Sequence, residues 1–388
     1  MTTLTNETAA RFGYISGLDG LRLLAVGIVI AAHYKIVPNV PGGFGVSIFF
    51  FISGFLITRL MLAEEKASGG IALGRFYIRR FIRLLPPLAL MGVVAVPALA
   101  LIAPADFSWS QVLLSFSYLG NIHKIGARLL SWNEGYGALE PLWSLAVEEH
   151  FYLALPPLLL LVRTHRGRIQ AMTGVLVGAL LLRMIVWAIA PEHADDINYN
   201  FTLTRIDAIG WGVMATLLLE AGVLRREWIE RHAQLLLWGG SCAMLASLVH
   251  WSAYYETVLK YTPQSAAIGA ALLGALFPAR TAWVRRTAEL PPVRYFGRIS
   301  YELYLWHLPV YAIVGHFVPD HFSRLALSML ATVLISAGAY SITTKRLAAL
   351  RRKFGGHPVE PASAMKPTSA SLPTLARSSV PSIQDYTP

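Results

Sequence analysis

Long apolar stretches recur along nearly the whole chain and limit what it can fold into. A helix needs roughly 20 mostly apolar residues to cross the hydrocarbon core of a bilayer, which is about 30 Å thick. The composition points the same way, because 55% of the 388 residues are hydrophobic and 14% are charged, whereas soluble globular chains carry about 25% charged residues. The sequence therefore predicts an all-α fold, a polytopic transmembrane helix bundle in a lipid bilayer.

About ten spans can be placed, and they divide the chain into three parts. The expected spans cover residues 18–37, 44–62, 86–103, 141–162, 171–190, 201–223, 233–250, 263–278, 299–317 and 325–341. We expect a cytoplasmic N-terminal segment (1–17), a transmembrane domain (18–344), and a cytoplasmic tail (345–388) that is basic and then disordered. Residues 1–17 lack the basic and apolar regions of a cleaved signal peptide, so the first span is expected to be an uncleaved anchor.

The distribution of lysine and arginine predicts the topology. Residues 107–121 are only moderately apolar, and if they do not cross the bilayer, most of the 33 Lys and Arg residues lie in loops on one side. Positively charged loops face the cytoplasm, so we expect residues 107–121 to be re-entrant or interfacial and both termini to be cytoplasmic. The net charge of +11 lies in short loops and not on a soluble surface, so we expect no nucleic acid partner.

Ionisable residues inside the predicted spans mark candidate functional positions, since charges within a bilayer are costly. Arg22 and His33 of the first span are eleven positions apart, which separates them by about 20° around a helix and roughly 16 Å along it. With Asp19 they form one polar stripe, with Arg22 near the cytoplasmic mouth and His33 toward the outer leaflet. The alternative is an ordinary Asp19–Arg22 pair at the helix end, with His33 at the opposite interface.

Two adjacent acids, Glu148 and Glu149, lie inside the expected span 141–162. A carboxylate beside an imidazole raises its basicity and fixes its tautomer, which suits a general base acting on a hydroxyl. We therefore expect one of these acids to meet His33 in a catalytic group. The alternative is a structural ion pair that holds two helices together. Lesser candidates, for which structural pairing is equally favoured, are Asp207 with Arg205 and His307 with Glu302.

An arginine-rich run, residues 75–83, precedes Pro86 and Pro87, where we expect a helix to begin. Arg80 and Arg83 would be neighbours on one helix face, and paired guanidinium groups suit the phosphates of a nucleotide or of coenzyme A. The alternative is that they only fix topology or contact lipid headgroups. Cys242 is the single cysteine, which rules out a multi-cysteine metal site, and we expect no metal.

Five segments, taken in order, make the sequence resemble the acyltransferase-3 family of integral membrane O-acyltransferases. They are GLDGLR at 17–22 followed by His33, GFGVSIFFFISGFLIT at 43–58, FYIRRFIRLLP at 76–86, LWSLAVEEHFY at 142–152 and ISYELYLWH at 299–307. Two positions depart from the family pattern, since Ser47 stands where the family often has Asp and Glu302 replaces a small polar residue.

The resemblance implies an acyl-CoA donor, most often acetyl-CoA. It also implies a carbohydrate, glycolipid or other hydroxyl acceptor, and a multi-pass protein of the bacterial inner membrane. Its motifs are Arg-x10-His, Arg-x-x-Arg and Trp-Ser-x-x-Val-Glu-Glu. The residues that these motifs assign to function are Arg22, His33, Arg80, Arg83, Glu148 and Glu149.

On this hypothesis Arg80 and Arg83 hold the CoA phosphates, with Arg22 at the mouth. His33, assisted by Glu148 or Glu149, acts as a general base or as an acyl relay, and the sequence does not choose between those roles. Two other functions stay open. One is acylation of a small hydroxylated natural product at the cytoplasmic side. The other is secondary transport, which predicts inverted repeats and paired broken helices that the sequence does not display.

Overall fold

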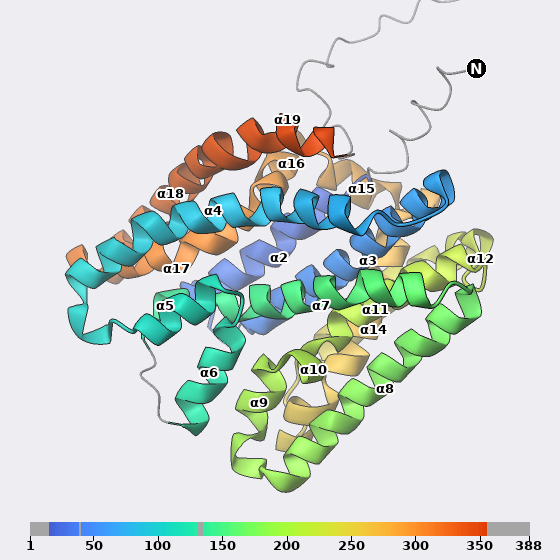
Figure 1. Ribbon diagram of the computed structural model, residues 1–388, viewed down its shortest axis with the longest axis horizontal. Helices are drawn as coiled ribbons and strands as arrows, with labels where there is room; N and C mark the ends of the chain where they lie inside the picture. The colour runs from blue at the N-terminus through green and yellow to red at the C-terminus, as the bar shows by residue number, and fades with distance from the viewer. Residues whose placement is uncertain (1–14, 39, 131–134, 355–388) are drawn as a thin grey trace, which may run out of the picture. The chain divides into compact units, whose positions relative to one another are not determined.

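The computed structural model describes residues 15–38, 40–130 and 135–354 (Figure 1). Within these ranges the chain forms helices and their connections, with no strand, which agrees with the predicted all-α fold. The predicted N-terminal segment up to residue 14 and the predicted tail from residue 355 onward lie outside the described residues.

The helices differ widely in length. The longer ones are α2 (Leu18–His33), α3 (Gly42–Ser68), α4 (Leu73–Ile102), α7 (Leu142–Leu161), α8 (His165–Ile189), α11 (Asp207–Glu220), α14 (Tyr261–Leu276), α17 (Ser300–Phe317) and α18 (His321–Tyr340). The shorter α-helices are α5 (Trp109–Phe116), α6 (Gly120–Leu129), α9 (Ala194–Asn200), α10 (Thr202–Arg205), α12 (Arg226–Arg231), α13 (Gly240–Ala246), α15 (Ala282–Ala288), α16 (Pro291–Arg298) and α19 (Arg346–Lys353). Single turns of other helix types are η1 (Pro104–Asp106), η2 (Gly137–Leu139), η3 (Pro191–His193), η4 (Leu235–Gly239), η5 (Tyr255–Leu259), η6 (Ala279–Thr281) and η7 (Ser341–Lys345).

Five helical segments of the described chain are long and apolar enough to cross a bilayer. They are α3, α4, α8, the stretch Gly137–Leu161, which ends with α7, and the stretch His321–Lys353, which begins with α18. A sixth is added if α14 and the stretch Ala279–Ala288, which meet at 90°, count as one span. By length and composition, these segments make the chain a multi-pass membrane protein, and every expected span falls on a helix or on successive helices.

Helix α4 begins earlier than predicted. It starts at Leu73, so Pro86 and Pro87 lie in its interior and not at its start. A proline removes one backbone hydrogen bond, but membrane helices tolerate it when neighbouring groups satisfy the freed backbone. The two prolines leave the backbone oxygens of Ile82 and Arg83 without their helical donors, and the hydroxyl of Tyr301 in α17 donates to the next backbone oxygen, that of Leu84, at 3.0 Å. The arginine-rich run and the apolar run are therefore one continuous helix.

Residues 107–121 form α5 and the first residues of α6. With eight residues, α5 is about 12 Å long, which is too short to cross the hydrocarbon core. This agrees with the expectation that the segment does not cross.

Helix α3 packs closely against α2 and α11 (Figure 1). A Cβ atom added to Gly54 would lie 2.0 Å from the backbone oxygen of Ile209 in α11, and one added to Gly212 would lie 2.1 Å from the backbone oxygen of Phe51. Since neither distance leaves room for a side chain, glycine lets the backbones of α3 and α11 touch.

Candidate active site

A pair of histidines joins the C-terminal end of α2 to the middle of α17. His33 is the last residue of α2, and its Nδ1 lies 2.9 Å from Nε2 of His307. The two rings stack with their centroids 5.0 Å apart. The next residue, Tyr34, donates its hydroxyl to the backbone oxygen of His307 at 2.9 Å, and this hydroxyl lies 2.7 Å from Oγ1 of Thr332 in α18. These contacts fix the end of α2 against α17 and α18.

The hydrogen bonds assign the tautomers of both rings. Nδ1 of His307 lies 2.6 Å from the backbone oxygen of Tyr304, which can only accept, so this nitrogen carries the proton. In the neutral ring Nε2 of His307 is then an acceptor, and Nδ1 of His33 must donate to it. Neutral His33 therefore keeps its lone pair on Nε2, where a general base or a nucleophile needs it.

The free side of the His33 ring faces Gly42 and an ion pair. A Cβ atom on Gly42 would lie 3.9 Å from Nε2 of His33, and the structure gives this nitrogen no hydrogen bond to another described residue. Lys124 of α6 and Glu140 both interact electrostatically with His33. Their own charged atoms lie 2.7 Å apart.

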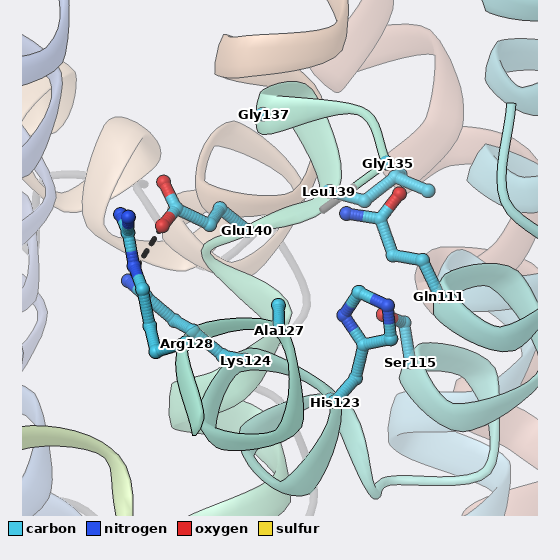
Figure 2. A pocket seen from close by; sticks show the side chains of 11 residues that line it. Gln111, Ser115, His123, Lys124, Ala127, Arg128, Gly135, Gly137, Leu139 and Glu140 are labelled. Carbon is cyan, nitrogen blue, oxygen red and sulfur yellow. Dashed lines mark ion pairs between the residues drawn. The ribbon is translucent and has the colours of Figure 1, made fainter. Parts of the chain in front are cut away.

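This ion pair also borders a polar pocket of about 140 Å³ between α5, α6 and η2 (Figure 2). The residues that line the pocket are Gln111, Ser115, Gly120, His123, Lys124, Ala127, Arg128, Gly135, Gly137, Leu139 and Glu140. Figure 2 shows the Glu140 carboxylate directed at the basic side chains of α6, with Gln111 of α5 on the opposite side. The pocket thus shares Lys124 and Glu140 with the surroundings of His33.

A second polar group lies around Arg80 of α4. One guanidinium nitrogen of Arg80 lies 3.7 Å from Oε1 of Glu148 and 4.0 Å from Oε1 of Glu149, and the guanidinium carbon lies 3.5 Å from the centroid of the Tyr152 ring. Ser53 of α3 and Tyr152 both donate to Glu148. Two buried nitrogens of Arg80, Nε and the ion-paired Nη2, have no hydrogen-bond partner among the residues that the structure describes. They can therefore donate to oxygen atoms of a ligand.

Two further arginines, Arg22 and Arg351, lie close to the pair Arg80 and Arg83. Arg83 interacts electrostatically with Arg22, Arg80 and Arg351, and within the described chain no ion pair is found for it. We call Arg22, Arg80, Arg83 and Arg351 the arginine cluster. Arg22 is paired with Asp19 at 3.4 Å, and Asp19 lies 3.7 Å from Arg298. Two carboxylates near Arg80 and one near Arg22 leave the cluster with an excess of positive charge, as an anion site requires.

Comparison with known proteins decides the family. Residues 15–343 match the family model described as an acyltransferase domain. The chain belongs to the acyltransferase-3 family. Peptidoglycan O-acetyltransferase OatA of Listeria monocytogenes is 28% identical over 337 residues, which are 83% of this chain and 54% of OatA. A Staphylococcus aureus protein named "Putative O-acetyltransferase SACOL0978" is 30% identical over 318 residues, 79% of this chain and 52% of that protein.

This acyltransferase-3 chain spans about half the length of the curated relatives that it matches. No solved structure is significantly similar to it.

In this acyltransferase the expected meeting of His33 with Glu148 or Glu149 does not occur. Neither acid shares a hydrogen bond or an ion pair with His33 in the described structure, because both acids face Arg80 and His33 is bonded to His307. The reason is depth along α7. Oγ of Ser144 lies 2.6 Å from the hydroxyl of Tyr304, one turn from His307, and Glu148 lies four residues, or about 6 Å, further along the helix.

The lesser candidate pairs are also different from those expected. Glu302 accepts a hydrogen bond from Thr344, 2.6 Å away, and not from His307. Asp207 lies 2.9 Å from Arg183 and not beside Arg205. Residues two positions apart point about 200° apart around a helix, so adjacent charges in the sequence do not meet across it.

Sequence reasoning therefore underrated His307, which sits in the ISYELYLWH segment. The sequence places His307 in that segment but does not show that it contacts His33, because the two residues lie 274 positions apart. Reasoning from the sequence also missed Lys124 and Glu140, since charged residues in a connection between spans look like ordinary surface.

Proposed function

We propose that this chain is a membrane O-acyltransferase that moves an acyl group, in the first place acetyl, from acyl-CoA to a hydroxyl of a carbohydrate or glycolipid. The observation that carries the proposal is the His33–His307 pair, which leaves the lone pair of His33 on Nε2. Membership in the acyltransferase-3 family supports it, as do relatives that are named for O-acetylation of peptidoglycan.

The proposed topology has ten spans with both termini in the cytoplasm of a bacterium, in its inner membrane. The arginine cluster would then lie toward the cytoplasm, where acyl-CoA is made, and His33 would lie near the outer side. Two features support a role for this cluster in binding the CoA phosphates: the two nitrogens of Arg80 that make no hydrogen bond within the described chain, and the three arginines near Arg83. The roughly 16 Å between Arg22 and His33 along α2 is of the length that an extended pantetheine arm must cover.

Acting as a general base, His33 removes the proton from the acceptor hydroxyl while the hydroxyl oxygen attacks the thioester carbonyl carbon. The new C–O bond forms as the C–S bond breaks, and Nε2 of His33 then returns the proton to the CoA thiolate. His307 keeps accepting from Nδ1 throughout and so stabilises the cationic His33. Glu148 and Glu149 act at the other end, by orienting Arg80.

As an acyl relay, Nε2 of His33 would attack the thioester carbonyl carbon while the C–S bond breaks and CoA leaves as the thiolate. The acceptor hydroxyl would then attack the acyl carbon as the C–N bond breaks, and the hydroxyl proton would pass to the thiolate. The same tautomer serves both roles. Rapid denaturation at neutral pH, where an acylimidazole survives longer than in acid, separates them for protein incubated with labelled acetyl-CoA and no acceptor. Only the relay leaves label on the protein, and His33→Ala must then abolish that label.

The function is tested with labelled acetyl-CoA added to purified protein in liposomes that contain cell-wall glycan and glycolipid. Label in the glycan or the glycolipid, lost in His33→Ala and retained in Cys242→Ala, is the expected result. Label in a small hydroxylated molecule in place of glycan would overturn the proposal that the acceptor is a carbohydrate or glycolipid. Unchanged acetyl-CoA, together with substrate movement across the bilayer, would reject the proposed transferase activity in favour of transport.

A further inference from the structure

We infer that the polar pocket between α5, α6 and η2 binds the acceptor as a single, uncharged carbohydrate ring. The inference rests on the proposed function and assigns a site to the acceptor, which the family motifs do not provide.

The pocket lies close to His33. Lys124 and Glu140 line the pocket and also interact electrostatically with His33. A ligand in the pocket therefore lies beside the residues that border the catalytic histidine. Nε2 of His33 makes no hydrogen bond within the described chain, and it lies 3.9 Å from the place that a Cβ atom on Gly42 would take, so the glycine leaves room there for an approaching hydroxyl.

The charges that line the pocket are compensated. Both bases of the pocket wall have an acid close by: the charged atoms of Lys124 and Glu140 are 2.7 Å apart, and those of Arg128 and Asp196 are 3.8 Å apart. Compensated charges bind hydroxyl groups through hydrogen bonds but give little attraction to a polyanion. The arginine cluster, with its excess of positive charge, suits phosphates better. The two ends of the molecule thus favour different substrates.

The pocket is small and its wall is rigidly held. The amide of Gln111 donates to the backbone oxygen of Tyr136 at 2.8 Å and accepts from its backbone nitrogen at 2.7 Å, so α5 holds the chain that leads into η2. Gly135 has φ +71°, a conformation open to glycine, and a Cβ there would lie 2.3 Å from Gln111. The volume of about 140 Å³ is below the roughly 300–1,000 Å³ of sites for drug-sized ligands. It suits one sugar ring and not an oligosaccharide.

Gly137 offers a way to fill the pocket without disturbing the fold. It lines the pocket, and a Cβ atom added to it meets no other atom within 4 Å. Substitutions Gly137→Ala and Gly137→Phe therefore place small and large side chains in open space. Gly174 of α8 also has nothing within 4 Å of an added Cβ and lies outside the site, so Gly174→Phe is the matched control.

The test uses the full chain in liposomes with labelled acetyl-CoA, and the acceptor probe is N-acetylglucosamine, a single uncharged ring. We expect the KM for the acceptor to rise slightly in Gly137→Ala and at least tenfold in Gly137→Phe. The KM for acetyl-CoA and the acceptor-independent hydrolysis of acetyl-CoA should stay at the level of Gly174→Phe.

Equal acceptor KM values in Gly137→Phe and Gly174→Phe would overturn the assignment of the pocket while leaving the enzyme intact. A rise in the KM for acetyl-CoA alone would show a donor site and would also overturn it. Absence of acetyl-CoA consumption in the unmodified chain would instead reject the proposed function, and the pocket assignment with it.

Discussion

Two buried arginines, Arg183 and Arg205, differ in how their charge is compensated. Arg183 is fully buried and fully satisfied, because it pairs with Asp207 at 2.9 Å and donates to two backbone oxygens and to Thr262. Arg205 is fully buried too, yet its one hydrogen bond goes to Oγ of Ser47, at 2.8 Å. Aromatic rings surround its guanidinium carbon, with centroids at 4.2 Å for Tyr261 and 5.7 Å for Tyr199 and Phe50. Nε and Nη1 of Arg205 have no hydrogen-bond partner in the part of the chain that the structure describes.

An uncompensated buried charge is costly, so Ser47→Asp should stabilise the protein. The new carboxylate would accept from Arg205 where Ser47 now does, and hydrogen bonds between charged groups contribute about 1.5–3 kcal/mol. We expect a higher melting temperature in detergent by scanning fluorimetry. Ser47→Asn has almost the same volume and no charge, so it should not raise the melting temperature. Equal effects of the two substitutions would show that Arg205 gains nothing from a carboxylate.

The role of His307 is testable by isosteres. The side-chain oxygen of a glutamine reaches the place of Nε2, whereas that of an asparagine reaches only the place of Nδ1. His307→Gln should therefore still accept from Nδ1 of His33 and keep most of the activity. His307→Asn should remove the hydrogen bond that fixes the tautomer of His33. It should therefore lower kcat by roughly 100-fold or more, the usual contribution of a general base.

In both His307 variants the KM for acetyl-CoA should remain near its original value, because the arginine cluster lies elsewhere. Size-exclusion profiles of the two variants must match, so that loss of folding is not mistaken for loss of tautomer control. Equal activity of His307→Gln and His307→Asn would contradict the positioning role.

At the level of helices, the sequence was a good guide to where elements lie and a poor one to which side chains meet. Each expected span falls on helix because a long apolar run in lipid must satisfy its backbone internally. The limits of α4 were wrong because prolines were taken as a helix start, although lipid-embedded helices accommodate them. The partner of His33 was also wrong, since a partner depends on which helices are neighbours and at what depth, and α17 follows α2 by more than 260 residues.

Contact between the backbones of α3 and α11 places these helices, and Gly54 is the position that permits it. Gly54→Ala puts a Cβ atom where only 2.0 Å is available to Ile209, so the helices must separate. Overpacking of this kind costs about 1–3 kcal/mol, and the melting temperature in detergent should fall. Gly174→Ala, in open space on α8, should leave stability unchanged or raise it by up to about 1 kcal/mol, because alanine favours helix. Equal stability of the two variants would contradict the close packing.

For the whole molecule, the proposed reaction depends on which side each end of α2 faces. The arginine cluster and the His33–His307 pair lie at opposite ends of that helix. A donor that enters from the cytoplasm therefore requires the N-terminal end of α2 to face inward. The pocket beside α5 and α6 then opens toward the outer side only if residues 107–121 do not cross. Donor and acceptor would in that case reach His33 from opposite sides of the membrane, so that acylation also carries the acyl group across.

Cysteine labelling tests this arrangement, because Cys242 is the single cysteine and Cys242→Ala removes it. On that background we introduce Gly70→Cys between α3 and α4, Asp106→Cys before α5, and Arg166→Cys at the start of α8. A membrane-impermeant maleimide added to intact spheroplasts should label only Asp106→Cys, and permeabilisation should make the other two reactive. If residues 107–121 did cross, Arg166→Cys would be labelled from outside together with Asp106→Cys. The acceptor pocket would then no longer be expected on the side opposite the arginine cluster, since an added crossing before α7 would reverse the direction in which α7 crosses the membrane.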